Sequence, residues 1–175
     1  LRALMCGFAA GLGAVSAMDR FTSLAENCQR APDPSLPYSA QERDATSLIA
    51  NSATRWMTGR NLSRRELKSG AEFVHHATAG VAGSLYGAMV YRSTAIVQSR
   101  IVSGLAGVCF GWGVWYIGDE LLLPALGVLK REDYTAAMRA EALVAHVVYG
   151  VATGLLYRQL AAVNQRPSSG GIGRS

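Results

Sequence analysis

The chain has few charged residues: only 17% of its 175 residues are Asp, Glu, Lys or Arg, whereas 50% are hydrophobic. This composition weighs against a disordered chain, a disulfide framework and a free nucleic-acid-binding protein. The three cysteines show no metal-ligand spacing such as Cys-x-x-Cys. A nucleophile elbow, a phosphate-binding glycine loop and a His-Glu-x-x-His zinc motif are also missing from the sequence, so we expect no enzyme.

Long apolar stretches are what the chain does contain. Each comes close to the roughly 20 residues that a helix needs to cross a bilayer. We therefore predict an all-α integral membrane protein, a single bundle over residues 1–163 followed by a disordered tail over 164–175 that is rich in Gly and Ser. The four predicted spans are residues 3–18, 73–91, 101–118 and 142–157.

Residues 20–70 form a long polar excursion between the first two spans. Its early prolines predict an irregular loop. A capping box at Ser39 and Glu42 then predicts an amphipathic helix that ends at Gly59 and lies over the bundle or in the headgroup layer. A second capping box at Ser63 and Glu66 predicts that the helix holding the second span begins outside the membrane.

The third span is followed by a short apolar segment. We expect the span to end near Asp119 and Glu120, because these two acids follow it directly. The segment after them is too short to cross a bilayer again, and Pro124 predicts a kink or a stop there. An interfacial or re-entrant piece is expected.

Two sets of residues recur at fixed offsets, which predicts two helical hairpins in tandem, related by a pseudo-two-fold axis along the membrane normal. Small residues at such spacing are typical of close helix packing. The first set recurs at an offset of 100 in the third span, and the second recurs at an offset of 70 in the fourth. The residues are Gly7, Gly11 and Asp19 with Gly107, Gly111 and Asp119, and then His76 and Gly80 with His146 and Gly150.

Six ionisable residues are expected at one depth, on the side of the bundle away from the termini. Ionisable residues inside a membrane are expensive and often functional. They could fix helix register by hydrogen bonds, relay protons or ions, or ligate a metal or tetrapyrrole through His75, His76 or His146. For a flat macrocycle, Ala71 and Ala142 would leave room one turn before a histidine. The six residues are His76, His146, Asp119, Glu120, Asp19 and His75.

The charges predict an orientation. With four spans, all twelve acids lie on the side opposite the termini. Short basic segments without acids are typical of the cytoplasmic side, so both termini are expected in the cytoplasm. The basic residues on the side of the termini are Arg2, Arg92, Arg100, Arg158, Arg166 and Arg174.

Three segments, residues 74–87, 111–127 and 145–150, resemble the YagU-like family of bacterial inner-membrane proteins. The resemblance implies a multi-span bundle in the inner membrane and carries over no reaction. The family's pattern is looser at His75 than at His76, so it favours His76 as the functional histidine. The family often has Asn where this chain has Asp19. The residues that match its motifs are His76, Asp119, Glu120, Pro124 and His146.

The expected function is that of a non-catalytic accessory or scaffold subunit. It would dock through Gly-rich and Trp-rich helix faces onto membrane lipids and onto other integral membrane subunits or a second copy of itself. No nucleic-acid partner is expected. The alternative is a small transporter or proton relay built on His76, His146, Asp119 and Glu120, which with only four spans would need a dimer.

Overall fold

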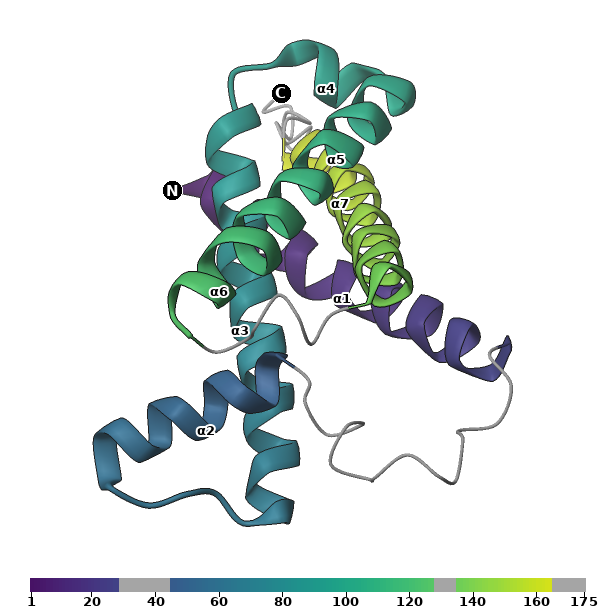
Figure 1. The fold of residues 1–175 in the computed structure, drawn as a ribbon. Coiled ribbons are helices and arrows are strands. Elements are labelled where there is room, and N and C mark those ends of the chain that lie inside the picture. The colour runs from purple at the N-terminus through teal and green to yellow at the C-terminus, as the bar shows by residue number, and fades with distance from the viewer. Residues whose placement is uncertain (29–44, 128–134, 165–175) are drawn as a thin grey trace, which may run out of the picture.

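A computed structural model describes residues 1–28, 45–127 and 135–164, and most of these residues are helical, with no strand among them. The all-α class predicted from the sequence is confirmed for this part of the chain. Figure 1 shows the helices gathered around α7, with α2 at the periphery. The elements are α1 (Arg2–Cys28), α2 (Ala45–Thr58), α3 (Arg64–Val90), α4 (Thr94–Gln98), α5 (Arg100–Trp115), the π-helix η2 (Tyr116–Leu122), α6 (Leu123–Ala125) and α7 (Ala136–Asn164).

Two helical segments of the described chain are long and apolar enough to cross a membrane, Arg100–Ala125 and Ala136–Val163. They contain the predicted third and fourth spans. Only 17% and 33% of their most apolar windows are buried within the chain, whereas the core helix of a soluble protein would be mostly buried. The predicted first and second spans fall within α1 and α3, which are 27 residues long each but are not among the two candidates.

Glycines bring α1 and α3 into backbone contact. A methyl group added at Gly7 would overlap the carbonyl oxygen of Gly83, and one added at Gly87 would overlap the carbonyl of Ala3. Gly11 is equally close to the carbonyl of Ala79. Gly7 and Gly11 therefore lie in this contact, and the two helices can approach this closely because these positions carry no side chain.

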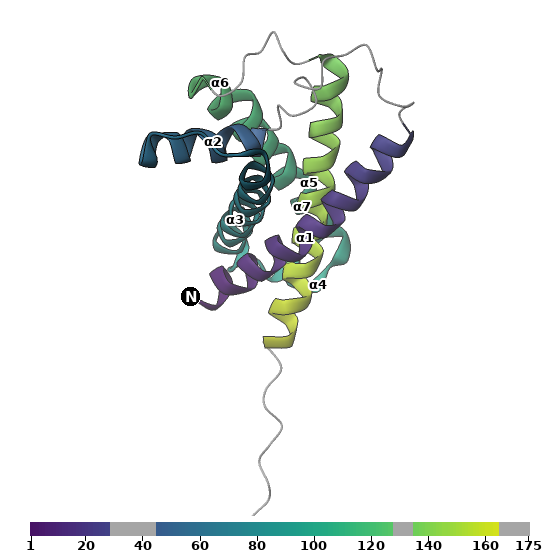
Figure 2. The same cartoon turned by 90° about the horizontal axis from the view of Figure 1, so that it is seen from below.

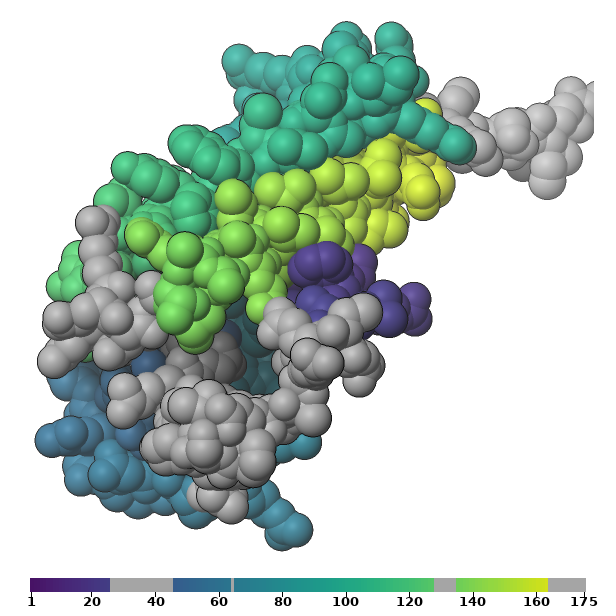
Figure 3. All heavy atoms as spheres, turned by 45° about the vertical axis from the view of Figure 1, so that its right-hand side comes forward, coloured from purple at the N-terminus to yellow at the C-terminus, as the bar shows by residue number. Residues whose placement is uncertain are grey.

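The pair α5 and α7 is built in the same way, and Figure 3 shows the two helices side by side along one face of the molecule. A methyl group at Gly107 would overlap the carbonyl oxygen of Gly150, and one at Gly111 would overlap that of His146. Gly154 stands against the carbonyl of Ser103. Gly107, Gly111 and Gly150 thus pack within the chain, as predicted.

The register of the second pair corrects the predicted repeat. Gly83 and Gly150 occupy equivalent places opposite Gly7 and Gly107, so the offset between α3 and α7 is 67 residues rather than 70. Gly80 does not match Gly150, because it faces the ring of Phe8. Residues three apart lie near one helical face, so a pattern of small residues does not distinguish these registers.

Aromatic side chains join the two pairs. Tyr86 of α3 packs 5.0 Å from Phe110 of α5 and 5.6 Å from Tyr157 of α7, measured between ring centroids. The Tyr149 hydroxyl donates a hydrogen bond of 2.7 Å to the carbonyl of Ala79. Helix α1 also packs along α7 and crosses it obliquely (Figure 2), so α7 contacts both pairs.

The helix of the third span does not end at the two acids, contrary to the sequence prediction. It continues from α5 through η2 and α6, and stops at Gly127, whose φ of 66° is left-handed. Pro124 has no N–H, and its ring would clash with the carbonyl of Glu120 in a regular α-helix. The wider π-helical turn directly before it relieves this clash and keeps the segment helical.

Two helix boundaries predicted between the first two spans are confirmed. The capping box at Ser63 and Glu66 begins α3, and Gly59 follows α2 with a φ of 73°. Helix α1 continues to Cys28 rather than ending at residue 18. The predicted box at Ser39 and Glu42, the proline-rich loop and the tail lie outside the described residues.

Candidate functional site

The predicted polar residues lie in two groups, and the first joins α1 to α3. His75 Nε2 is 3.2 Å from Asp19 Oδ1. His75 is half-buried and Asp19 is exposed, beside an open hollow of about 430 Å³ that also includes Arg20 and Leu24. The repeat predicted an Asp in contact with a His, and the structure forms that contact with His75.

His76 takes a different role from the one the sequence favoured. Its Nδ1 lies 2.8 Å from the carbonyl oxygen of Glu72 on the same helix, and the side chain is exposed. A carbonyl only accepts hydrogen bonds, so Nδ1 carries the proton. His75, and not His76, is therefore the histidine that contacts Asp19. Adjacent residues on a helix point about 100° apart, and only tertiary packing determines which one faces α1.

The second group lies between η2 and α7. His146 Nδ1 is 3.9 Å from Asp119 Oδ2 and donates a 2.8 Å hydrogen bond to the carbonyl of Ala142. Both side chains are largely buried. In the neutral ring the proton therefore sits on Nδ1, and Nε2 is the acceptor. An ion pair with Asp119 forms only when the ring is also protonated at Nε2.

Glu120 forms the strongest polar contact of this group. Arg139 of α7 donates from Nε to Oε1 at 2.8 Å and from Nη2 to Oε2, so the pair is bidentate. Glu120 is buried, and it contacts α7 from within the π-helical turn. Sequence analysis missed Arg139, which precedes the predicted fourth span by three residues. The available signal was a buried acid followed by a basic residue at the start of the next helix.

The Trp-rich face predicted on α5 is exposed on the surface of the described chain. Trp112 stacks on Tyr116 with the rings 5.5 Å apart and nearly parallel, and Trp112 is 52% exposed. Beside this face runs an apolar groove of about 660 Å³ between α5 and α7. Its lining residues are Val108, Cys109, Trp112, Leu143, Val144 and Val147.

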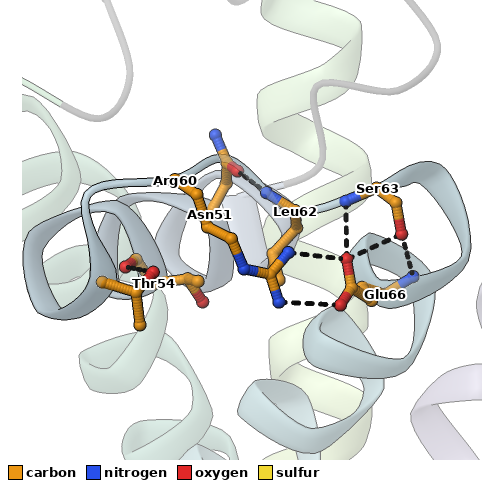
Figure 4. A network of polar contacts seen from close by, with 7 residues as sticks. Asn51, Thr54, Arg60, Leu62, Ser63 and Glu66 are labelled. Carbon is orange, nitrogen blue, oxygen red and sulfur yellow. Dashed lines mark hydrogen bonds and ion pairs between the residues drawn. The ribbon is translucent and has the colours of Figure 1, made fainter.

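A polar network outside the predicted spans fixes the turn between α2 and α3 (Figure 4). Glu66 accepts hydrogen bonds from Arg60 at 2.9 and 3.1 Å and from the Ser63 hydroxyl at 2.7 Å. These bonds, first that of Arg60 and then those of Ser63, lower the pKa of Glu66 to about 2. Asn51 of α2 accepts from the Leu62 amide at 2.9 Å, which ties α2 to the turn.

The described residues contain no group of three or more His, Cys, Asp or Glu side chains that could hold a metal ion. Their polar groups form two acid–base pairs in different helix pairs, at Asp19 with His75 and at Asp119 with His146, and the salt bridge of Glu120 with Arg139. This chemistry suits proton binding and helix registration. No family model, curated protein or solved structure matches the chain.

Proposed function

We propose that the chain is a non-catalytic integral membrane subunit that packs an exposed apolar helix face against a partner membrane helix. The bacterial inner membrane is the proposed location, with both termini in the cytoplasm. The proposal includes four spans, in α1, α3, the Arg100–Ala125 segment and α7, arranged as two tandem hairpins. The glycine contacts support the tandem arrangement, because Gly7 meets Gly83 as Gly107 meets Gly150.

The observation that carries the proposal is the outer face of α5. Its apolar side chains recur at intervals of three and four residues and are all exposed, which is the pattern of one continuous helical face. A contiguous apolar face of this kind marks contact with lipid or with another protein. The face consists of Ile101, Leu105, Val108, Trp112 and Tyr116.

A partner helix is favoured over lipid alone by the space on this helix. Among the described residues, no atom beyond the adjoining part of the same helix lies within 4 Å of a methyl group added at Gly104 or Gly113. Open glycines let a second helix approach the backbone closely. The predicted packing glycines are occupied inside the chain, so docking would depend on the larger side chains of α5 and on Gly104, which lies one turn from Val108 on the helix surface.

The test is native sizing after mild detergent extraction from the native membrane, with mass spectrometry of every co-migrating chain. A stoichiometric partner, or a second copy of the chain, is expected. Gly104→Leu should then release that partner, because the leucine fills the approach path without a clash inside the chain. Ala88→Leu is the matched control, since it adds the same bulk at an exposed position of α3. A particle with the mass of a single chain in the native membrane extract would refute the proposal.

The second candidate is a proton relay or small transporter. The π-helical turn favours it, since such turns are frequent at functional sites. The turn places the buried Glu120 on Arg139 and Asp119 near His146, at the same end of the Arg100–Ala125 segment. In this function, His146 would exchange a proton through Nε2.

Proton flux in vesicles containing the purified chain tests this candidate. Asp119→Asn and His146→Ala should abolish a pH-dependent flux while leaving the helical content unchanged. His76→Ala, named by the sequence analysis, should have little effect, because His76 is exposed and bonded to its own helix. Equal flux in the parent chain, Asp119→Asn and His146→Ala would exclude the relay.

A further inference from the structure

Helix α2 packs on α3 and leaves two of its large apolar side chains exposed. Ala50 is buried against Gly70, and Asn51 holds the Leu62 amide, so this side of α2 faces the protein. On the outer side Trp56 is 88% exposed and Met57 is 75% exposed. An amphipathic helix on a soluble domain buries such large apolar side chains, because burial of its apolar stripe is what holds it in place.

Basic residues are frequent in the segment that joins α2 to α3. Residues 55–68 contain five Arg or Lys and a single acid, Glu66, which Arg60 binds. The side chains of Arg55, Arg65 and Lys68 are exposed. The segment that joins α2 to α3 therefore carries net positive charge, which suits a negatively charged partner.

The position of α2 fits the boundary of a bilayer. It meets α3 at Gly70, three residues before the exposed Phe73, which begins the apolar outer side of α3 that also carries Val81 and Met89. Figure 1 shows α2 crossing α3 at a wide angle. A helix that crosses a spanning helix where its apolar stretch begins would lie in the plane of the membrane surface.

We propose that the α2–α3 hairpin is a docking surface for anionic lipid. Trp56 and Met57 enter the headgroup layer, and Arg55, Arg65 and Lys68 bind lipid phosphates. Tryptophan favours this layer because one end of its ring is apolar and the other donates a hydrogen bond. The network at Glu66 fixes the hairpin so that its apolar side stays toward the bilayer (Figure 4). This inference rests on the proposed membrane location of the chain.

Tryptophan fluorescence of the full chain in lipid vesicles tests the inference. The variant Trp112→Phe with Trp115→Phe leaves Trp56 as the single tryptophan. We expect a blue-shifted emission and quenching by lipids brominated near the headgroup. The quenching should be stronger in phosphatidylcholine vesicles that contain phosphatidylglycerol than in phosphatidylcholine alone, and added salt should reduce that difference. Arg55→Gln, Arg65→Gln and Lys68→Gln together should abolish it.

A second single-tryptophan variant, Trp56→Phe with Trp115→Phe, reports on Trp112 of α5 and separates two failures. Quenching of Trp112 by deeply brominated lipid without quenching of Trp56 overturns this inference alone. Absence of quenching at both positions overturns the membrane location as well. Equal quenching of Trp56 in neutral and anionic vesicles overturns the proposed binding of anionic lipid. If Trp56 is shielded from solvent in lipid-free detergent and the particle has the mass of two chains, the surface binds a second copy of the chain. That result also overturns the proposed lipid binding.

Discussion

At the scale of single residues, backbone contact between glycines holds each helix pair together. Four of these glycines, Gly7, Gly83, Gly107 and Gly150, stand where a methyl group would overlap a carbonyl of the facing helix. Gly104, on the same helix as Gly107, has open space instead. The same substitution should therefore have opposite effects at two positions of one chain.

Gly83→Ala should destabilise the fold by about 1–3 kcal/mol, because the added methyl must push α1 away from α3. Gly104→Ala, the control, should be neutral or stabilise the helix by about 0.5–1 kcal/mol, since alanine restricts the unfolded chain more than glycine does. Thermal unfolding in detergent, followed by circular dichroism, measures both. Equal midpoints for the two variants would contradict the glycine contact.

The salt bridge of Glu120 with Arg139 is a second feature of single residues. Glu120→Gln should lower the unfolding midpoint more than Glu66→Gln does, because Glu120 is buried whereas Glu66 and its partner Arg60 are exposed. The double variant Glu120→Gln with Arg139→Gln should recover part of the loss, since the guanidinium is then no longer left without its acid. A loss in the double variant equal to the sum of the losses in the two single variants would argue against a coupled pair.

At the scale of elements, the network at the start of α3 makes the α2–α3 turn sensitive to acid. The pKa of Glu66 falls to about 2 from an ordinary 4.5, first because Arg60 binds the carboxylate and then because Ser63 does. A lowered pKa in the folded chain means that the ionised form is the one that stabilises the turn. The stabilisation is complete above pH 4.5 and is lost as the pH falls toward 2.

Fluorescence anisotropy of Trp56, in the chain without Trp112 and Trp115, should therefore decrease between about pH 4.5 and 2 as α2 gains mobility. Raised salt should weaken the effect because Arg60 and Glu66 are exposed. Glu66→Gln is the control: it cannot ionise, so its anisotropy should be low already and should not change over this range. An unaltered titration in Glu66→Gln would assign the transition to another group.

At the scale of the whole molecule, the antiparallel pairs separate two ends. The contacts of Ala3 with Gly87 and of Ser103 with Gly154 place the start of α1, the end of α3 and the start of α5 at one end. Helix α4 packs on α5 and α7 at this same end. The acid-containing pairs of Asp19, Asp119 and Glu120 lie toward the other end, beyond the glycine contacts.

In a four-span arrangement, Thr94 of α4 and Thr58 of α2 should lie on opposite sides of the membrane. Single cysteines at these exposed positions, in a chain without its native cysteines, can be labelled with a thiol reagent that does not cross membranes. We expect Thr94→Cys to react in inside-out vesicles and Thr58→Cys in right-side-out vesicles. Reaction of both from the same side would contradict a single crossing of the membrane by α3.

The sequence by itself determined what depends on neighbouring residues along the chain. Apolar stretches predicted the helices because a helix hides its own backbone polar groups. The Ser63 and Glu66 box fixed the start of α3, and Gly59 fixed the end of α2, since both act within a few residues. The presence of packing glycines was also readable from their spacing.

Only the tertiary structure decided which residues meet. It set the offset of 67 rather than 70 between α3 and α7, chose His75 over His76 as the partner of Asp19, and brought Arg139 to Glu120. Each choice depends on the rotation of one helix against another, and a shift of one residue rotates a side chain by about 100°. Composition does not encode that rotation. It is set by the backbone contacts at the glycines and by the π-helical turn before Pro124.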